Sequence, residues 1–187
     1  MLKRFTSTAV LLTMLLTILC TGSFVGSAEE AAVESAAPFS VFERDADTDA
    51  WQAVATDADT LERAVNAVTK RFGRIEINHD YIMSGRVDNT SGAPAMLAAG
   101  KTISIVGNGH TAYVDQFAYP VNFARGTFLV DGFHIKTLTG GKSPDGMVRV
   151  YPDAEVTVTN AVWEVAEGTA SKWGTVCVYG LLTLGEN

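Results

Sequence analysis

Two histidines and an aspartate are the residues whose types and spacing first suggest chemistry. His110 and His134 lie 24 residues apart, and Asp131 precedes the second histidine by three. An imidazole titrates near neutral pH and serves as acid, base or metal ligand, and a nearby carboxylate orients it. The three side chains are candidates for one polar site if the chain repeats at about this spacing. Two solvated histidines in turns are the alternative.

The glycines beside His110 raise a second question. In GKTISIVGNGHTAYVD, residues 100–115, glycines flank Asn108 after a β-branched run. A glycine-rich loop that binds phosphate must open a helix, whereas HTAYVD continues as a strand. We therefore predict that GNG is a corner between two strands, and that DGF, residues 131–133, forms the same corner one repeat later.

Lyase chemistry on a polyuronate would need several carboxylates around Ca²⁺, with an arginine or lysine as the base. The candidates are Asp115, Asp131, Asp145, Asp153, Lys136, Arg149 and Lys172. No two of these acids fall at the same phase of adjacent repeats. We therefore assign no catalytic residue, metal site or cofactor, and Ca²⁺ enters only with the lyase alternative.

Aromatic side chains at turns and strand ends are the other indication of binding. Sugar rings pack their C–H faces against such rings, and a row of them along one face would hold a glycan. The candidates are Tyr113, Tyr119, Tyr151, Trp163 and Trp173. The alternative is that these rings fill the core and its corners.

The N-terminus predicts export. Lys3 and Arg4 precede an uncharged apolar run, residues 9–20, and small residues follow, which indicates a signal peptide cleaved after Ala28. Lipidation at Cys20 is the alternative. Removal of residues 1–28 leaves 12 of the 14 basic residues against 21 acidic ones, a net charge of −9. Such an acidic chain does not suit nucleic acid, and its single remaining cysteine, Cys177, excludes an intrachain disulfide.

Residues 29–50 are rich in alanine and acidic residues without a sustained period, so we predict a linker there. Residues 51–73 predict a short strand and then a helix over 60–72, since apolar residues recur three and four apart. Asp59, with Glu62 three residues later, is the expected N-cap. We expect this amphipathic helix to cap the first strands of the domain.

The rest of the chain, residues 74–187, alternates apolar and polar residues, which predicts an all-β body. The strands also resemble one another at nearly constant separations. GMVRVY and GTVCVY begin 28 residues apart. Val156 and Val158 match Phe128 and Val130 at a separation of 28, these match Ile103 and Ile105 at 25, and those match Ile75 and Ile77 at 28. A period in the twenties without a helix predicts a parallel β-helix of about five rungs.

Several stretches carry a family resemblance: WQAVATDADTLERAVNAV, GRIEINHDYI, GKTISIVGNGHTAYVD, GTFLVDGFHI, GMVRVYPDAEVTVTN and GTVCVYGLLTLGEN. Together, over about residues 51–187, they resemble bacterial secreted right-handed parallel β-helix proteins of the pectin-lyase-like superfamily. The adhesin-like, cell-surface branch is the most similar. The resemblance implies an all-β, right-handed parallel β-helix with an N-terminal capping α-helix.

For function, the resemblance implies a secreted or cell-surface, non-catalytic module that binds carbohydrate or a host or neighbouring surface. A polysaccharide lyase or other carbohydrate-active enzyme on the same scaffold is the alternative, because this fold carries both kinds of activity. The last stretch, LLTLGEN, stops in mid-rung or just after a strand, so we expect an open edge there. Further rungs, a partner or self-association would cover the open edge.

Overall fold

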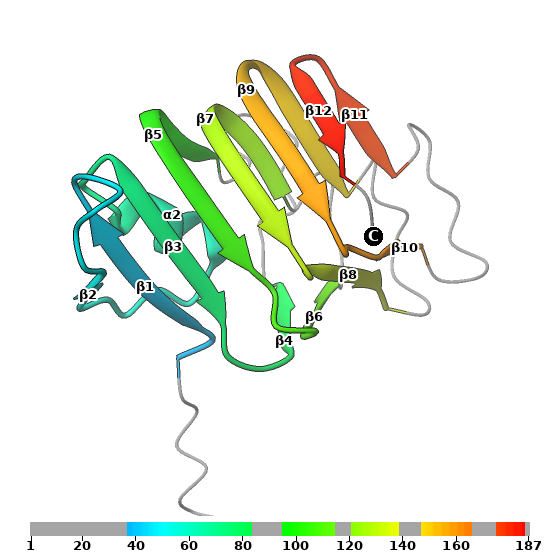
Figure 1. The fold of residues 1–187 in the computed structure, drawn as a ribbon. Coiled ribbons are helices and arrows are strands. Elements are labelled where there is room, and N and C mark those ends of the chain that lie inside the picture. The colour runs from blue at the N-terminus through cyan, green and yellow to red at the C-terminus, as the bar shows by residue number, and fades with distance from the viewer. Residues whose placement is uncertain (1–36, 84–94, 115–120, 139–146, 166–174, 186–187) are drawn as a thin grey trace, which may run out of the picture. The chain divides into compact units, whose positions relative to one another are not determined.

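A computed structural model describes residues 37–83, 95–114, 121–138, 147–165 and 175–185. These residues form a mostly β structure with one short helix (Figure 1). The elements in chain order are β1 (Phe39–Arg44), β2 (Gln52–Val54), α2 (Leu61–Ala67), β3 (Phe72–Ile77), β4 (Tyr81–Met83), β5 (Met96–Val106), β6 (Thr111–Val114), β7 (Val121–Asp131), β8 (His134–Thr137), β9 (Val148–Thr159), β10 (Trp163–Glu164), β11 (Val176–Val178) and β12 (Leu181–Leu184). No helix within the described ranges has the length and apolar character needed to span a membrane.

The strands belong to two sheets. The larger has eight strands in the order β11-β9-β7-β5-β3-β1-β2, and β12 also pairs with β9. From β3 onward its strands run parallel, whereas β1 pairs antiparallel with both β3 and β2. The smaller sheet has four parallel strands in the order β10-β8-β6-β4. Figure 1 shows the long strands of the larger sheet side by side, with β5, β7 and β9 bending back along their length.

The prediction of a right-handed parallel β-helix is wrong. Among the described strands the sheets are open, and neither closes on itself to form a solenoid. The sheet is also mixed, because β1 and β2 add antiparallel strands at one end. Each repeat supplies one long strand to the larger sheet and one short strand to the smaller. This pattern produces the constant separation of matching residues in the sequence, and it does not require the two sheets to close into a solenoid.

Several strand matches in the repeat are nevertheless confirmed as real pairs. Phe128 lies opposite Val156 on β9 and opposite Ile103 on β5. At the start of the sheet the predicted register is wrong by two residues, because Ile105 pairs with Ile75 and not with Ile77. A shift of two keeps every side chain on its predicted face, since strand side chains alternate with a period of two.

Alternation along the strands builds one apolar core. On β3 the buried side chains are Ile75 and Ile77, both 0% exposed, while Arg74 and Glu76 between them are partly exposed. The short strands bury alternate residues in the same way, for example Ala112 and Val114 on β6. Both sheets contribute to a single cluster of buried residues. Complete burial of one such aliphatic side chain stabilises the fold by roughly 1.5–3 kcal/mol.

The helix is shorter than predicted and has another cap. It begins after Thr60, whose hydroxyl accepts a hydrogen bond from the backbone N–H of Arg63 at 3.3 Å. Asp59, the predicted N-cap, instead forms an ion pair with the Arg63 side chain at 2.8 Å. The helix buries Leu61, Ala64 and Val65 and contacts β1, β3 and β5. It therefore packs against the first strands, but the edge of β3 that it was predicted to cap is paired with β1.

A glutamate on β1 explains where the helix ends. The Glu43 carboxylate accepts hydrogen bonds from the backbone N–H groups of Thr69 at 2.7 Å and Lys70 at 3.1 Å. Partial burial works against ionisation of Glu43, but these hydrogen bonds hold its pKa below the ordinary value. Because the carboxylate takes both donors, the chain leaves the helix after Ala67 and enters β3 at Phe72.

Strand β1 itself lies inside the segment predicted as a linker, residues 29–50. Phe39 and Val41 are buried, and six residues of β1 pair with β3. The expectation that regular structure begins near Trp51 is therefore wrong. Only two buried positions alternate on this strand, which is too short a pattern to stand out from alanine-rich and acidic surroundings.

Candidate binding site

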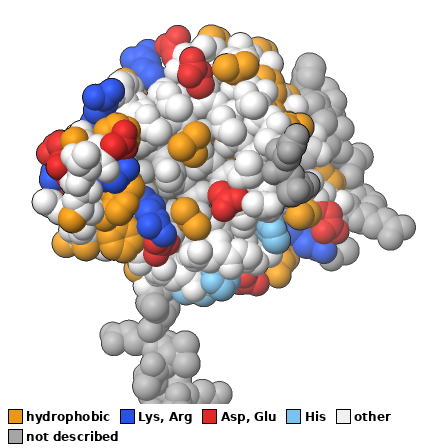
Figure 2. All heavy atoms as spheres, in the orientation of Figure 1, with side chains coloured by type: hydrophobic (Ala, Val, Ile, Leu, Met, Phe, Trp, Pro, Cys, Tyr) orange, Lys and Arg blue, Asp and Glu red, His pale blue; other side chains and the backbone are white. Residues whose placement is uncertain are grey.

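The predicted polar group of His110, Asp131 and His134 lies at turns where strands of the larger sheet lead into strands of the smaller one. His134 begins β8, and its backbone N–H donates to the carbonyl oxygen of His110 at 3.4 Å. The side chains of His110 and Asp131 contact other residues. His110 pairs with Asp80, Nδ1 to Oδ1, at 3.4 Å. Asp131 accepts hydrogen bonds from the Thr159 hydroxyl at 2.7 Å and from the Asn160 amide at 2.8 Å. Figure 2 shows histidine side chains along the lower margin of the face in view.

Hydrogen bonds at these turns stabilise the charged carboxylates. The backbone N–H of Thr111, and then His110, hold the pKa of Asp80 below its ordinary value. The side chains of Asn160 and Thr159 do the same for Asp131. Both aspartates thus serve as acceptors that fasten a turn, a role that sequence reasoning did not assign to Asp131. It missed Asp80 and Asn160 entirely.

The GNG turn is confirmed as a corner between two strands. It connects β5 to β6, and Asn108 has a positive φ of 54°. The Asn108 amide donates to the carbonyl oxygen of Ile77 at 3.1 Å, so it joins this turn to the preceding repeat. A Cβ on Gly107 would lie 2.0 Å from the carbonyl oxygen of Gly132. Close backbone packing, and not phosphate binding, accounts for this glycine.

The acids and bases considered for a lyase are dispersed where the structure describes them. Lys136 pairs with Glu164 at 3.0 Å, and the Arg149 guanidinium lies 5.6 Å from the ring centre of Tyr151. Asp115, Asp145 and Lys172 lie outside the described residues. Within the described ranges, no three His, Cys, Asp or Glu side chains gather as ligands for a metal ion.

The aromatic candidates separate into different environments. Tyr113 lies half-buried on β6, and Trp163 on β10 packs against the core. Tyr119 and Trp173 lie outside the described residues. Tyr151 on β9 lines a hollow in the surface. The described rings therefore do not form the predicted row, but one of them belongs to a concave site.

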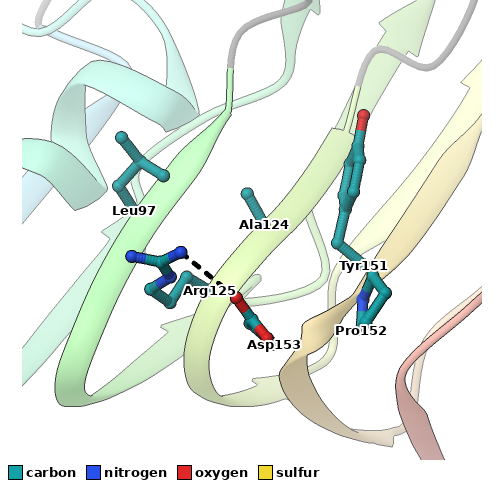
Figure 3. Close-up of a pocket in the computed structure, with 6 residues that line it drawn as sticks. All are labelled: Leu97, Ala124, Arg125, Tyr151, Pro152 and Asp153. Carbon is teal, nitrogen blue, oxygen red and sulfur yellow. Dashed lines mark hydrogen bonds and ion pairs between the residues drawn. The ribbon is translucent and has the colours of Figure 1, made fainter.

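This hollow lies where β5, β7 and β9 bend. Its volume is about 390 Å³, and it is lined by Leu97, Ala124, Arg125, Tyr151, Pro152 and Asp153. Figure 3 shows Leu97, Ala124 and Tyr151 standing on three neighbouring strands. The bend depends on Gly126, which has a φ of 111° and leaves only 2.1 Å between an added Cβ and the carbonyl oxygen of Ala98. Any side chain there would push the strands apart.

The polar part of the hollow is an ion pair between two strands. Arg125 on β7 lies in register with Asp153 on β9, and Nη2 is 3.1 Å from Oδ2. Their side chains are 57% and 65% exposed, so both keep hydrogen-bonding capacity toward a ligand. The dashed line in Figure 3 marks this pair. The two opposite charges leave the hollow with no formal net charge.

The apolar part is the ring of Tyr151, which contacts Arg149 two residues earlier on the same strand. The Tyr151 hydroxyl accepts a hydrogen bond from Arg149 Nη1 at 3.2 Å. Tyr179 comes directly after β11, and its backbone N–H donates to the Val150 carbonyl at 2.8 Å. A second tyrosine, 64% exposed, therefore follows at the corresponding position of the next strand. Arg125 was missed from the sequence, although it lies 28 residues from Asp153, the spacing that links the strands.

Comparisons with known proteins give no relative: no family model, curated protein or solved structure matches this chain.

Proposed function

We propose that this protein is an exported, non-catalytic surface module that binds neutral carbohydrate in the hollow at Tyr151, Arg125 and Asp153. The observation that carries the proposal is the combination of a fixed aromatic ring with an exposed arginine–carboxylate pair in one concavity of about 390 Å³. Small-molecule sites typically measure about 300–1000 Å³.

The chemistry of the lining matches that of a sugar. The C–H face of a pyranose packs against an aromatic ring, and adjacent hydroxyl groups hydrogen-bond a carboxylate and a guanidinium together. Leu97, which is 56% exposed, and Ala124 add apolar surface beside the ring. An extended glycan could continue from Tyr151 toward Tyr179.

Charge favours a neutral glycan. Arg125 and Asp153 compensate each other, and the whole chain has a net charge of −7. A polyuronate or other polyanion would approach an acidic protein against electrostatic repulsion. The export segment predicted at residues 1–28 would bring the protein to surfaces where such glycans occur.

The test is a glycan array, followed by calorimetric titration with the neutral oligosaccharides that bind. We expect Tyr151→Ala to weaken binding at least about tenfold, because the stacking surface is lost. The control is Leu129→Ala, which shortens a 43%-exposed side chain on β7 outside the hollow and should leave binding unchanged.

Three results would contradict the proposal. Binding that survives Tyr151→Ala would place the glycan elsewhere. Formation of an unsaturated product from a polyuronate in the presence of Ca²⁺ would establish a lyase and exclude a purely binding role. Equal loss of binding in the Tyr151→Ala and Leu129→Ala proteins would show that the hollow itself has no special part.

A further inference from the structure

One end of the larger sheet is formed by β11 and β12. Strand β11 pairs with residues 148–150 of β9, and β12 pairs with residues 155–158 of the same strand. Within the described ranges, no strand pairs with the opposite side of either. The backbone groups of Val176, Val178, Leu182 and Leu184 point away from β9 and have no strand partner among the described residues. An edge of this kind recruits another strand.

The side chains at this end continue the core but are not covered. The inward positions of β11 and β12 lie in register with those of β9: Val176, Val178, Leu182 and Leu184 opposite Val148, Val150, Val156 and Val158. All four valines of β9 are buried, with exposures of 0–7%. In contrast, Val178 is 45% exposed and Leu184 is 74% exposed. Apolar core positions thus face solvent at this end.

The absence of charged side chains at the β11–β12 end favours a second copy of this chain as the partner. Residues 175–185 contain no charged side chain, in a chain whose net charge is −7. When two copies pair around a two-fold axis, each edge meets itself, so any charge near the axis would oppose an identical charge. The β11–β12 edge contains none. Elsewhere, two acidic copies would repel each other.

We infer that the β11–β12 end binds the same end of a second copy of this chain, forming an edge-to-edge dimer. The contact places Val178 and Leu184 of each copy against the other copy and pairs the outward backbone groups of the two edges. The committed partner is a second copy because the edge is neutral, apolar and compatible with itself.

The experiment measures the mass of the exported protein by sedimentation velocity over an about hundredfold range of concentration. The edge variant carries Val178→Lys and Leu184→Lys, which put like charges into the contact. The matched control is Leu129→Lys, since Leu129 is 43% exposed on β7, a strand with neighbours on both sides. Circular dichroism melting establishes that each variant is folded.

We expect the wild type and the Leu129→Lys control to dimerise with rising concentration, and the edge variant to dimerise at least about tenfold more weakly. If the edge variant does not fold, Leu184→Pro tests the same contact by removing an outward backbone donor of β12. A wild type that stays monomeric throughout would overturn the inference. So would a dimer that the lysines and the proline leave intact, because another surface would then form it.

Discussion

The two ends of the larger sheet are terminated in opposite ways. At the β1–β2 end the strands turn antiparallel, and the edge strand β2 has only three residues. There the Arg44 guanidinium lies 4.4 Å from the ring centre of Trp51 and pairs with Asp47 at 2.8 Å. At the β11–β12 end the strands stay parallel, and apolar side chains are exposed among uncharged neighbours.

The difference shows that the core repeat does not determine the character of the outermost strands that the structure describes. Strand registry propagates the same alternation from β3 to β9, but each end needs residues outside that alternation. Short edge strands and charged side chains prevent a sheet from pairing with other molecules, and the β1–β2 end has both. The β11–β12 end has short strands without the charges, so we expect its exposed backbone and apolar groups to pair with a second copy of the chain.

The largest difference between the ends should appear when a bulky apolar residue is removed from each. Phe39 on β1 is 3% exposed and its ring packs against Tyr81 with a centroid distance of 5.0 Å. We expect Phe39→Ala to lower the free energy of unfolding by about 3–5 kcal/mol. In the monomer, Leu184→Ala should lower it by less than about 0.5 kcal/mol, because little apolar area is buried there. Urea denaturation at low protein concentration measures both; equal losses would contradict the comparison.

The next largest effect on stability concerns Glu43, whose carboxylate joins β1 to the residues that follow α2. We expect Glu43→Gln to reduce stability by about 1–2 kcal/mol at neutral pH, because a neutral amide accepts the two backbone hydrogen bonds less strongly. The folded pKa of Glu43 is lowered, so its contribution is present above the unfolded pKa and is lost as pH falls through the folded pKa.

Denaturation of the wild type and of Glu43→Gln at a series of pH values checks this. The difference between them should shrink as pH falls below the ordinary range of a glutamate. Glu155→Gln, an exposed residue of β9, is the control and should show little difference at any pH. A gap for Glu43→Gln that grows in acid would refute the assigned role.

A smaller effect distinguishes the observed helix cap from the predicted one. Thr60→Ala removes the hydroxyl that accepts from the Arg63 N–H and should cost about 1 kcal/mol. Asp59→Ala breaks only an exposed ion pair, so we expect less than about 0.5 kcal/mol. Thermal melts of the two variants give the order, and the reverse order would restore Asp59 as the cap.

The smallest effect on stability is expected between the two ends, in the hollow. Arg125→Met removes one member of an exposed pair and should change the free energy of unfolding by less than about 0.5 kcal/mol. Glycan binding should fall in the same variant, since the guanidinium donors are lost. Titration and melting of one sample separate the two effects, and a variant that binds as the wild type does would remove Arg125 from the site.

Periodicity explains how much of this structure the sequence predicts. Alternation identifies which side chains face the core, and the 28-residue spacing identifies pairs such as Val130 with Val158, because both are local consequences of strand geometry. Whether the sheets close into a solenoid cannot be read from the same pattern. It depends on strand twist and on bends such as the one at Gly126, which no alternation of residue types records.

The candidate site was predictable in parts. Tyr151 and Asp153 were named for separate reasons, one as a stacking ring and the other as an acid. Arg125 was not named, because the repeat spacing was applied to apolar residues, histidines and acids but not to pairs of opposite charge. The partner of His110 was missed for a related reason: Asp80 lies 30 residues upstream, outside the 24–28 spacings under consideration.

The turn at Asn108 also has a consequence for the chemical lifetime of the protein. An asparagine followed by glycine loses ammonia when the next backbone nitrogen attacks its side-chain carbonyl, giving a succinimide and then isoaspartate. In the folded chain the Asn108 amide is bonded to the Ile77 carbonyl at 3.1 Å, which restrains the rotation that this attack needs. The accumulation of isoaspartate at residue 108 in stored protein would therefore record how often this corner opens.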